Sequence, residues 1–201
     1  MRKIGAVILA AGEARRFGEA KQLVRFRGST LLRRAVDAAV DSGCAPVVVV
    51  VGAVRNEIID EVRGRAVQIA HNREWEAGIG TSISCGLHHS LGQTQLDGVV
   101  LLASDQPFVA ADLIARLIAA ADTVGKTISA SRYAGTLGIP ALFLANHFPA
   151  LLTLSGELGA KGLIHSNQGA VAEIAFEKGA IDIDTRADFE LLSRMPAATI
   201  P

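Results

Sequence analysis

A loop rich in glycine and arginine follows the first apolar run of this 201-residue chain. Its glycines, Gly12 and Gly18, permit close backbone approach, and exposed backbone N–H groups in such a loop can bind phosphate oxygens. Five basic residues and one acid stand between positions 15 and 27, and the basic ones are Arg15, Arg16, Lys21, Arg25 and Arg27. This local positive charge suits a polyanion such as a triphosphate. The alternative is a surface turn with solvated arginines.

Two familiar phosphate-binding loops are excluded by spacing. A Walker A loop needs four residues between its glycines and a lysine directly after the second glycine. Here five residues separate Gly12 from Gly18, and Glu19 follows. The dinucleotide pattern G-x-G-x-x-G also fails, because the stretch 78–80 is followed by Ile83 where the third glycine belongs.

An acidic turn, Ala103-Ser104-Asp105-Gln106-Pro107, follows the apolar run Val99–Leu102. If that run is a strand of an open α/β sheet, Asp105 faces the crevice at the carboxyl ends of the strands, beside the first loop. Mg²⁺ bound with a nucleotide is typically held by one or two carboxylates together with phosphate oxygens and water. Asp105 suits that role. The alternative is a cap for a helix that begins near Phe108 or Asp112.

Two further carboxylates, Asp182 and Asp184, stand two positions apart near the end of the chain. In an extended stretch this spacing puts both side chains on the same side. One of them could therefore complete a metal site with Asp105. Spacing does not separate this interpretation from capping, in which Asp184 or Thr185 begins the last helix.

Three short aliphatic runs must position these loops: Gly5–Ala10, Val47–Val51 and Val99–Leu102. Continuous apolar runs of this length are typical of strands buried on both faces. Amphipathic helices are expected between them, at 30–41 and 111–122, with Ser29 as a cap and Gly43 as a stop for the first. Strands that alternate with helices indicate an α/β fold with a mostly parallel sheet.

The second half of the chain is less regular. The pattern predicts strands at Lys126–Arg132, Ile139–Leu144 and Val171–Phe176, and helices at Glu157–Asn167 and Asp188–Arg194. Pro140 is expected to open the second of these strands, at its edge, where a proline is tolerated. No linker and no long repeat divides the chain, so we expect one domain over residues 1–201.

Composition narrows the class of protein. The 20 basic residues balance the 20 acidic ones, and this neutrality argues against a nucleic-acid partner. The longest apolar run, Cys44 to Val54, is far shorter than the ~20 residues that cross a bilayer, so no membrane partner is expected. The two cysteines, Cys44 and Cys85, are too few for a disulfide framework, which favours the cytoplasm.

The start of the chain also has the pattern of a secretory signal, because Met1-Arg2-Lys3 precedes an apolar run. However, Glu13, Arg15 and Arg16 stand where a cleavage site needs small neutral residues. The same pattern of an apolar run followed by a loop recurs twice more in the chain. We therefore interpret the run as a buried strand.

The motif Leu9-Ala10-Ala11-Gly12-x-x-x-Arg16-Phe17-Gly18-x-x-Lys21 resembles the signature loop of the MobA-like nucleotidyltransferases. It is most similar to the branch that contains molybdenum cofactor cytidylyltransferase. Further stretches resemble the family in the same order along the chain: 72–83, 103–107, 133–143, 154–161 and 182–185.

The resemblance implies a Rossmann-like three-layer fold with a mostly parallel, mixed central sheet. It implies CTP or another nucleoside triphosphate over the first loop, Mg²⁺ or Mn²⁺, and a molybdopterin-type acceptor with a terminal phosphate. The implied nucleotide-binding residues are Leu9, Ala11, Gly12, Arg16, Lys21, Gly80 and Ser82. The implied catalytic residues are Arg16, Lys21 and Asp105, and the implied metal ligands are Asp105, Asp184 and Asp182. The implied acceptor-binding residues are Gly138, Pro140, Gly156 and Lys161.

Ala11 stands where the guanylyl branch of the family usually has a second glycine, which favours the cytidylyl branch. Other positions depart from the family pattern. Ile139 replaces a frequent histidine, Arg186 a common proline, and Glu157 and Lys161 a frequent aspartate and arginine. The change from arginine to lysine loses bidentate phosphate recognition on the acceptor side.

Three functions follow from these observations. The first is transfer of CMP from CTP to the terminal phosphate of molybdopterin or molybdenum cofactor, with release of pyrophosphate. The second is the same chemistry with another nucleotide or phosphorylated acceptor. The third is a non-catalytic cofactor carrier or maturation factor. A recipient molybdoenzyme or its maturation factor is a further expected partner. The combination of Arg16, Lys21 and Asp105 favours catalysis.

Overall fold

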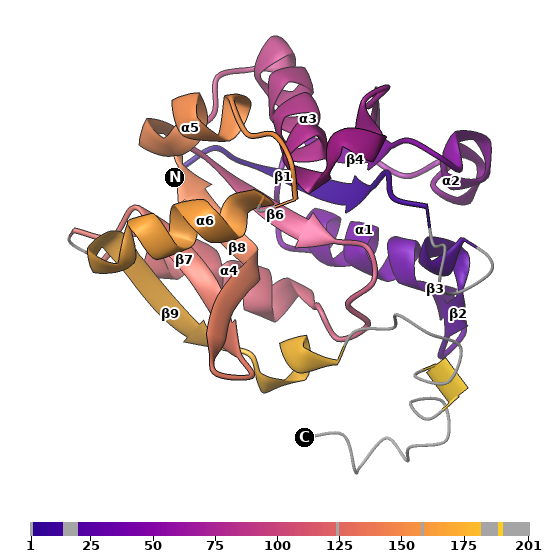
Figure 1. Ribbon diagram of the computed structural model, residues 1–201. Coiled ribbons are helices and arrows are strands. Elements are labelled where there is room, and N and C mark those ends of the chain that lie inside the picture. The colour runs from indigo at the N-terminus through magenta and orange to yellow at the C-terminus, as the bar shows by residue number, and fades with distance from the viewer. Residues whose placement is uncertain (1, 14–19, 124, 158, 182–188, 191–201) are drawn as a thin grey trace.

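A seven-stranded sheet forms the centre of the computed structural model, which describes residues 2–13, 20–123, 125–157, 159–181 and 189–190 (Figure 1). Its strand order is β5-β4-β1-β6-β8-β7-β9. All strands run in one direction except β8, which is antiparallel to its neighbours β6 and β7. This mixed, mostly parallel sheet confirms the expected Rossmann-like α/β architecture. The bounds are β1 Ile4–Ala10, β4 Val47–Val51, β5 Gln68–His71, β6 Gly98–Ala103, β7 Ile128–Tyr133, β8 Thr136–Leu144 and β9 Val171–Ala175.

Helices cover both faces of the sheet. Alternate residues of a strand face opposite sides, so Ala6 and Ile8 of β1 belong to one core and Val7 and Leu9 to the other. The first core includes side chains from α1 (Leu31–Asp41), α2 (Arg55–Glu61) and α4 (Ala111–Ala120). The second includes side chains from α3 (Ile79–Gln93), α5 (Phe148–Leu152) and α6 (Gly159–Ser166). Figure 1 shows α3, α5 and α6 on one side of the sheet and α1 and α4 on the other.

The remaining elements are short and lie in the connections. A two-stranded ribbon pairs β2 (Arg25–Phe26) with β3 (Ser29–Thr30). The 3₁₀ turns are η1 Lys21–Leu23, η2 Trp75–Ala77, η3 Ala145–His147, η4 Gln168–Ala170 and η5 Glu177–Ala180. No helix in the described part of the chain combines the length and apolar character needed to cross a bilayer.

The three predicted buried strands are confirmed as β1, β4 and β6, which lie side by side in the sheet. The predicted helices at 30–41 and 111–122 are confirmed as α1 and α4. The N-cap of α1 is Thr30 and not the expected Ser29, because the Thr30 side chain accepts a hydrogen bond from the backbone N–H of Arg33. The predicted closing helix lies outside the described residues except at Phe189 and Glu190, which are helical.

The expectation that Pro140 opens its strand is wrong. Its strand, β8, begins at Thr136 and lies between β6 and β7. The register with β7 shifts there, since Ala130 pairs with Ala141 whereas Ser131 pairs with Gly138. Ile139 and Pro140 therefore fall in a bulge, where the missing N–H of proline interrupts no ladder pair.

The helix α6 begins at Gly159, two residues later than the predicted start at Glu157. Gly159 has a φ of +51°, and a Cβ there would lie 2.7 Å from the Ile79 side chain. The chain therefore turns tightly against α3 before the helix begins. This turn brings the 154–157 segment over the start of α3, beside the site described below.

Candidate active site

A cavity of about 460 Å³ lies at the carboxyl ends of β1 and β6. Its walls come from the end of β1, from η1, from the segment between η2 and the first turn of α3, and from the turn after β6. This is the place where open α/β sheets bind ligands. Six of the predicted site residues line it together: Leu9, Ala11, Gly12, Lys21, Ser82 and Asp105.

An ion pair between Lys21 and Asp105 spans this cavity wall. Lys21 Nζ lies 2.7 Å from Asp105 Oδ2, and each side chain is 22% exposed. The pair brings together two loops that are distant in sequence, one after β1 and one after β6. The helix-cap alternative for Asp105 is wrong, because α4 begins at Ala111 and its N-cap is Ala110. The Asp105 carboxylate thus contacts Lys21 at the cavity and does not cap α4.

The end of β1 is held by hydrogen bonds to each of four successive carbonyl groups. Gln22 is buried and donates through Nε2 to two of them, and its own Oε1 has no hydrogen-bond partner among the described residues. The donors are Ser104 Oγ to Leu9 O at 2.9 Å, Gln22 Nε2 to Ala10 O at 3.2 Å, Ala53 N to Ala11 O at 3.1 Å, and Gln22 Nε2 to Gly12 O at 2.8 Å. The backbone of residues 9–12 is therefore held in place where it enters the cavity wall.

The start of α3 packs directly on the backbone of the 155–156 segment. Gly80 N donates to Gly156 O at 3.0 Å, and a Cβ on Gly80 would lie 2.7 Å from Ser155 N. Gly78 has a φ of +111°, and its Cβ would lie 2.4 Å from the carbonyl carbon of Gly156. Only glycine fits these two positions. Gly80 therefore allows the start of α3, which forms part of the cavity wall, to pack against the backbone of Gly156.

Asn72 orients Ser82 in the first turn of α3. Its Nδ2 donates to Ser82 Oγ at 3.0 Å and to Thr81 Oγ1 at 2.9 Å. Its Oδ1 accepts from Glu74 N at 2.9 Å. Asn72 and Ser82 are both buried, so this amide fixes the serine hydroxyl at the cavity wall.

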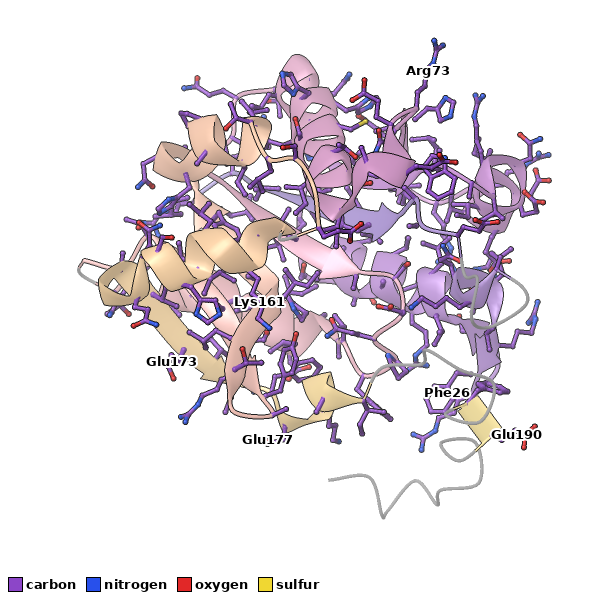
Figure 2. The ribbon with its side chains drawn as sticks, viewed as in Figure 1. Phe26, Arg73, Lys161, Glu173, Glu177 and Glu190 are labelled. Atoms are coloured by element: carbon purple, nitrogen blue, oxygen red, sulfur yellow. The ribbon has the colours of Figure 1, made fainter. Side chains whose placement is uncertain are left out.

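The other predicted acceptor residues lie apart from the cavity lining. Gly138 and Pro140 are buried in β8, and a Cβ on Gly138 would lie 2.5 Å from the Tyr133 hydroxyl oxygen. Lys161 is exposed on α6, as Figure 2 shows. Arg16, Asp182 and Asp184 lie outside the described residues, so their predicted roles stay predictions.

The sequence reasoning did not assign some residues that line the cavity: Glu13, Gln22, Trp75, Glu76, Gly78, Ile79 and Glu157. Trp75 packs against the turn after β4, where a Cβ on Gly52 would lie 2.8 Å from the Trp75 ring. Gln22 stands directly after Lys21, but no periodic pattern marks a buried glutamine in a polar loop. The resemblance had drawn attention to Glu157 only as a departure from the family pattern.

Carboxylates dominate the described lining of the cavity, since Glu13, Glu76, Asp105 and Glu157 surround the single described cation, Lys21. Among the described residues, no cluster of three or more metal-binding side chains is present. A Mg²⁺ or Mn²⁺ site of the nucleotide type needs only one or two carboxylates, because phosphate oxygens and water complete it. The donor chemistry of Asp105 fits such a site.

The turn that carries Asp105 is also anchored from α1. Arg34 donates from Nε to Pro107 O at 2.9 Å. Burial, together with the neighbouring Arg27, lowers the pKa of the Arg34 guanidinium, which nevertheless stays protonated at neutral pH. On the other helical layer, Cys85 of α3 packs against the second core, and burial raises the pKa of its thiol, which disfavours the thiolate.

The fold and the site together define an α/β protein with an acid–lysine pair in a cavity at the carboxyl ends of its central strands. Residues 6–171 match the model of the MobA-like NTP transferase domain. The chain therefore belongs to the MobA-like nucleotidyltransferase family.

The chain is similar to proteins of several named functions. It is 28% identical to the purine catabolism protein PucB of Bacillus subtilis, covering 94% of this chain and 95% of that protein. It is 28% identical to nicotine blue oxidoreductase of Paenarthrobacter nicotinovorans, covering 90% and 92%. It is 32% identical to molybdenum cofactor guanylyltransferase of Rhodobacter capsulatus, covering 67% and 68%.

Solved structures share the fold. Rv0371c of Mycobacterium tuberculosis is 28% identical, with a TM-score of 0.78 over 96% of this chain and 98% of that one. A second structure of Rv0371c, in complex with manganese, has a TM-score of 0.73 over 96% and 99%, also at 28% identity.

Proposed function

We propose that this protein is a cytidylyltransferase that transfers CMP from CTP to the terminal phosphate of a molybdopterin-type acceptor and releases pyrophosphate. The observation that carries the proposal is the Lys21–Asp105 pair in the cavity at the ends of β1 and β6. A lysine and a carboxylate 2.7 Å apart match the two needs of nucleotidyl transfer, which are a cation for the triphosphate and a ligand for its metal ion.

The reaction is an in-line displacement at the α-phosphorus of CTP. An oxygen of the acceptor phosphate forms the new bond to this phosphorus, and the bond to the bridging oxygen of the β-phosphate breaks. The electron pair leaves with pyrophosphate. A phosphate nucleophile is already ionised near neutral pH, so no general base is required. Lys21 and Arg16 would stabilise the negative charge that develops on the pyrophosphate.

Asp105 would hold a divalent cation in this scheme, with Asp184 or Asp182 as a second ligand. The cation, when bound, would neutralise charge on the α-phosphate. Lys21 carries three N–H donors, so it can keep its bond to Asp105 and contact a phosphate oxygen at the same time. The similarity to Rv0371c, which has been solved with manganese, supports a divalent cation here as well.

Ala11 supports cytidine over guanosine as the donor base. Its side chain is buried at the cavity wall, and its carbonyl is held by Ala53 N. The Ala11 carbonyl lies close to Gly52, where an added Cβ would be only 2.5 Å from Ala11 O. We infer that the Ala11 methyl narrows the cavity where a larger purine base would bind.

A second candidate function is either the same reaction with different substrates or a non-catalytic role. Glu157 lines the cavity, and its side chain is one methylene longer than the aspartate that is frequent at this position in the family. The longer carboxylate changes the space that is open to an acceptor. This favours an enzyme with another triphosphate or another phosphorylated acceptor, or a carrier that delivers the cofactor to a molybdoenzyme or its maturation factor. The similarity to PucB and to nicotine blue oxidoreductase, which are not named as nucleotidyltransferases, keeps this candidate in view.

The two candidates are distinguished by pyrophosphate release with Mg²⁺ and each of the four ribonucleoside triphosphates, with and without a molybdopterin-type acceptor. Release with CTP only when that acceptor is present supports the cytidylyltransferase. Release with another triphosphate or another phosphorylated acceptor supports the related enzyme. Binding of CTP without any release supports the carrier.

A further inference from the structure

Two buried glutamines stand directly after the two members of the ion pair. Gln22 follows Lys21 in η1, and Gln106 follows Asp105 in the turn after β6. They are 3% and 5% exposed. Each one is therefore a polar side chain enclosed next to a charged residue that faces the cavity.

Both glutamines use their amide group in the same way. Gln22 Nε2 donates to Ala10 O and Gly12 O, at 3.2 and 2.8 Å. Gln106 Nε2 donates to Ile139 O and Gly179 O, at 3.3 and 3.4 Å. An amide NH₂ group has two hydrogens, and each is used. Carbonyl oxygens only accept, so the NH₂ end of each amide must be the one that faces them.

The opposite end of each amide is different. Within the described part of the chain, Gln22 Oε1 and Gln106 Oε1 are buried and have no hydrogen-bond partner. A buried acceptor without a donor costs free energy. An apolar side chain of similar length, such as methionine, would avoid that cost, so packing alone does not require glutamine at these positions. The two donors of each amide must supply the benefit.

The positions of the four carbonyls show which segments the two glutamines connect. Gln22 ties η1, which begins with Lys21, to the end of β1. Gln106 ties the turn that carries Asp105 to the bulge of β8 and to η5, near the Glu177 labelled in Figure 2. The bulge carbonyl, Ile139 O, also accepts from the Tyr133 hydroxyl at 3.0 Å.

We propose that Gln22 and Gln106 are positioning residues that set the geometry of the Lys21–Asp105 pair for nucleotidyl transfer. Gln22 fixes the lysine relative to the first loop, and Gln106 fixes the aspartate relative to the β8 segment that contains the predicted acceptor residues. Because a peptide unit is planar, holding the carbonyls of Ala10 and Gly12 also fixes the direction of the N–H groups that follow them.

The test uses Gln22→Met and Gln106→Met, which keep the side-chain length and remove the donors. The activity readout rests on the proposed function and measures pyrophosphate release from CTP with Mg²⁺ and a molybdopterin-type acceptor. We expect kcat to fall by about 10²-fold, since a displacement of about 1 Å in a reacting group can have that effect, while KM for CTP changes by less than about threefold. Gln168→Met on the exposed turn η4 is the matched control and should leave kcat unchanged.

A second readout does not depend on catalysis. The coupling between Lys21 and Asp105 is measured by a double-mutant cycle in urea unfolding, with Lys21→Met and Asp105→Asn, in the wild type and in each glutamine variant. We expect the coupling to fall by more than half when either glutamine is replaced. If Gln22→Met does not fold, Gln22→Asn shortens the amide by one methylene, and both readouts apply to it.

The outcomes separate the two proposals. Loss of coupling in the glutamine variants supports the positioning role, even if the wild-type protein transfers no nucleotide and the proposed function fails. Wild-type coupling and wild-type kcat in both glutamine variants would overturn the positioning role and leave the proposed function intact. A loss of activity that Gln168→Met reproduces would also overturn it.

Discussion

At the scale of single residues, the site depends on two opposite charges that are only partly enclosed. Lys21 and Asp105 are each 22% exposed, so a ligand can reach both. Ion pairs in contact with solvent contribute little to folding, because water solvates the separated charges well. The pair is therefore better explained by what it binds than by what it stabilises.

Replacing either charge should remove activity and keep the fold. For Asp105→Asn and for Lys21→Met we expect kcat for nucleotidyl transfer to fall by at least about 10²-fold, because each variant removes charge stabilisation in the transition state. The free energy of unfolding should change by no more than about 1 kcal/mol, as expected for a partly exposed pair. Asp60→Asn, which breaks the exposed pair of Asp60 on α2 with Arg63 in the turn that follows, is the control. Full turnover in Asp105→Asn would contradict its role.

The choice of nucleotide can be tested at Ala11. The variant Ala11→Gly removes one methyl group from the cavity wall, and we expect a relative gain for GTP over CTP. A single methyl or methylene group in a binding pocket changes specificity by about 10–200-fold, so the ratio of kcat/KM values should shift within that range. The measurement is steady-state kinetics with both triphosphates. An unchanged ratio would show that Ala11 does not limit the size of the base.

At the scale of elements, α3 connects the core to the site. Gly86 allows the helix to approach the sheet, because a Cβ there would lie 2.4 Å from Val7 and 2.7 Å from Val50. The first turn of the same helix carries Ser82 to the cavity. A helix that sits this close to β1 and β4 places its N-terminal turn accurately at the ends of those strands.

Two glycines of α3 give a matched pair of stability tests. Gly86→Ala forces a methyl group into the sheet, and we expect the free energy of unfolding to fall by about 1–3 kcal/mol. A Cβ added to Gly92 would meet no atom within 4 Å, so Gly92→Ala should stabilise the helix by up to about 1 kcal/mol. Urea unfolding of both variants checks the contrast. Equal effects of the two substitutions would show that the close contact of α3 with the sheet at Gly86 does not determine stability.

The elements also show what the sequence could predict. Continuous apolar runs identified β1, β4 and β6, because strands covered on both faces need no polar alternation. The strand β5 was not predicted, since Gln68–His71 is only four residues long and half of them are polar. The place of Pro140 was mistaken because a bulge depends on the register with β7, which local sequence does not encode.

The sequence predicted only those site residues that belong to recognisable local motifs. Lys21 and Asp105 each follow a recognisable strand, so their meeting could be expected from the topology. The bridges made by Gln22 and Gln106 depend on carbonyls that are distant in sequence or hidden in a loop, and no residue pattern marks them. Side-chain contacts of this kind become visible only in the folded chain.

At the scale of the whole molecule, the sheet separates two cores and a histidine lies at the margin of one. His147 in η3 is buried, and its Nε2 lies 2.8 Å from Thr127 Oγ1. Burial lowers the pKa of His147, because the charged imidazolium is poorly solvated there. The folded protein therefore favours the neutral ring.

This histidine makes stability depend on pH. In the unfolded chain its pKa is about 6.5, so acid protonates the unfolded state first and favours unfolding. The stabilising contribution is present above about pH 6.5 and is lost as the pH falls toward the lower pKa of the folded state. We expect His147→Gln to show a smaller loss of stability than the wild type between pH 7.5 and 5. His165→Gln on the exposed part of α6 is the control, and an identical pH profile for His147→Gln and wild type would contradict the account.

The central claim is that the cavity at the ends of β1 and β6 transfers a nucleotidyl group and that Asp105 is needed for the step. The most direct test supplies CTP labelled at the α-phosphate, Mg²⁺ and a molybdopterin-type acceptor, and follows the label by chromatography. The account predicts that the wild-type protein moves the label onto the acceptor in a 1:1 ratio with pyrophosphate and that Asp105→Asn does not. Label that stays in CTP with the wild-type protein, or that moves equally well with Asp105→Asn, would contradict it.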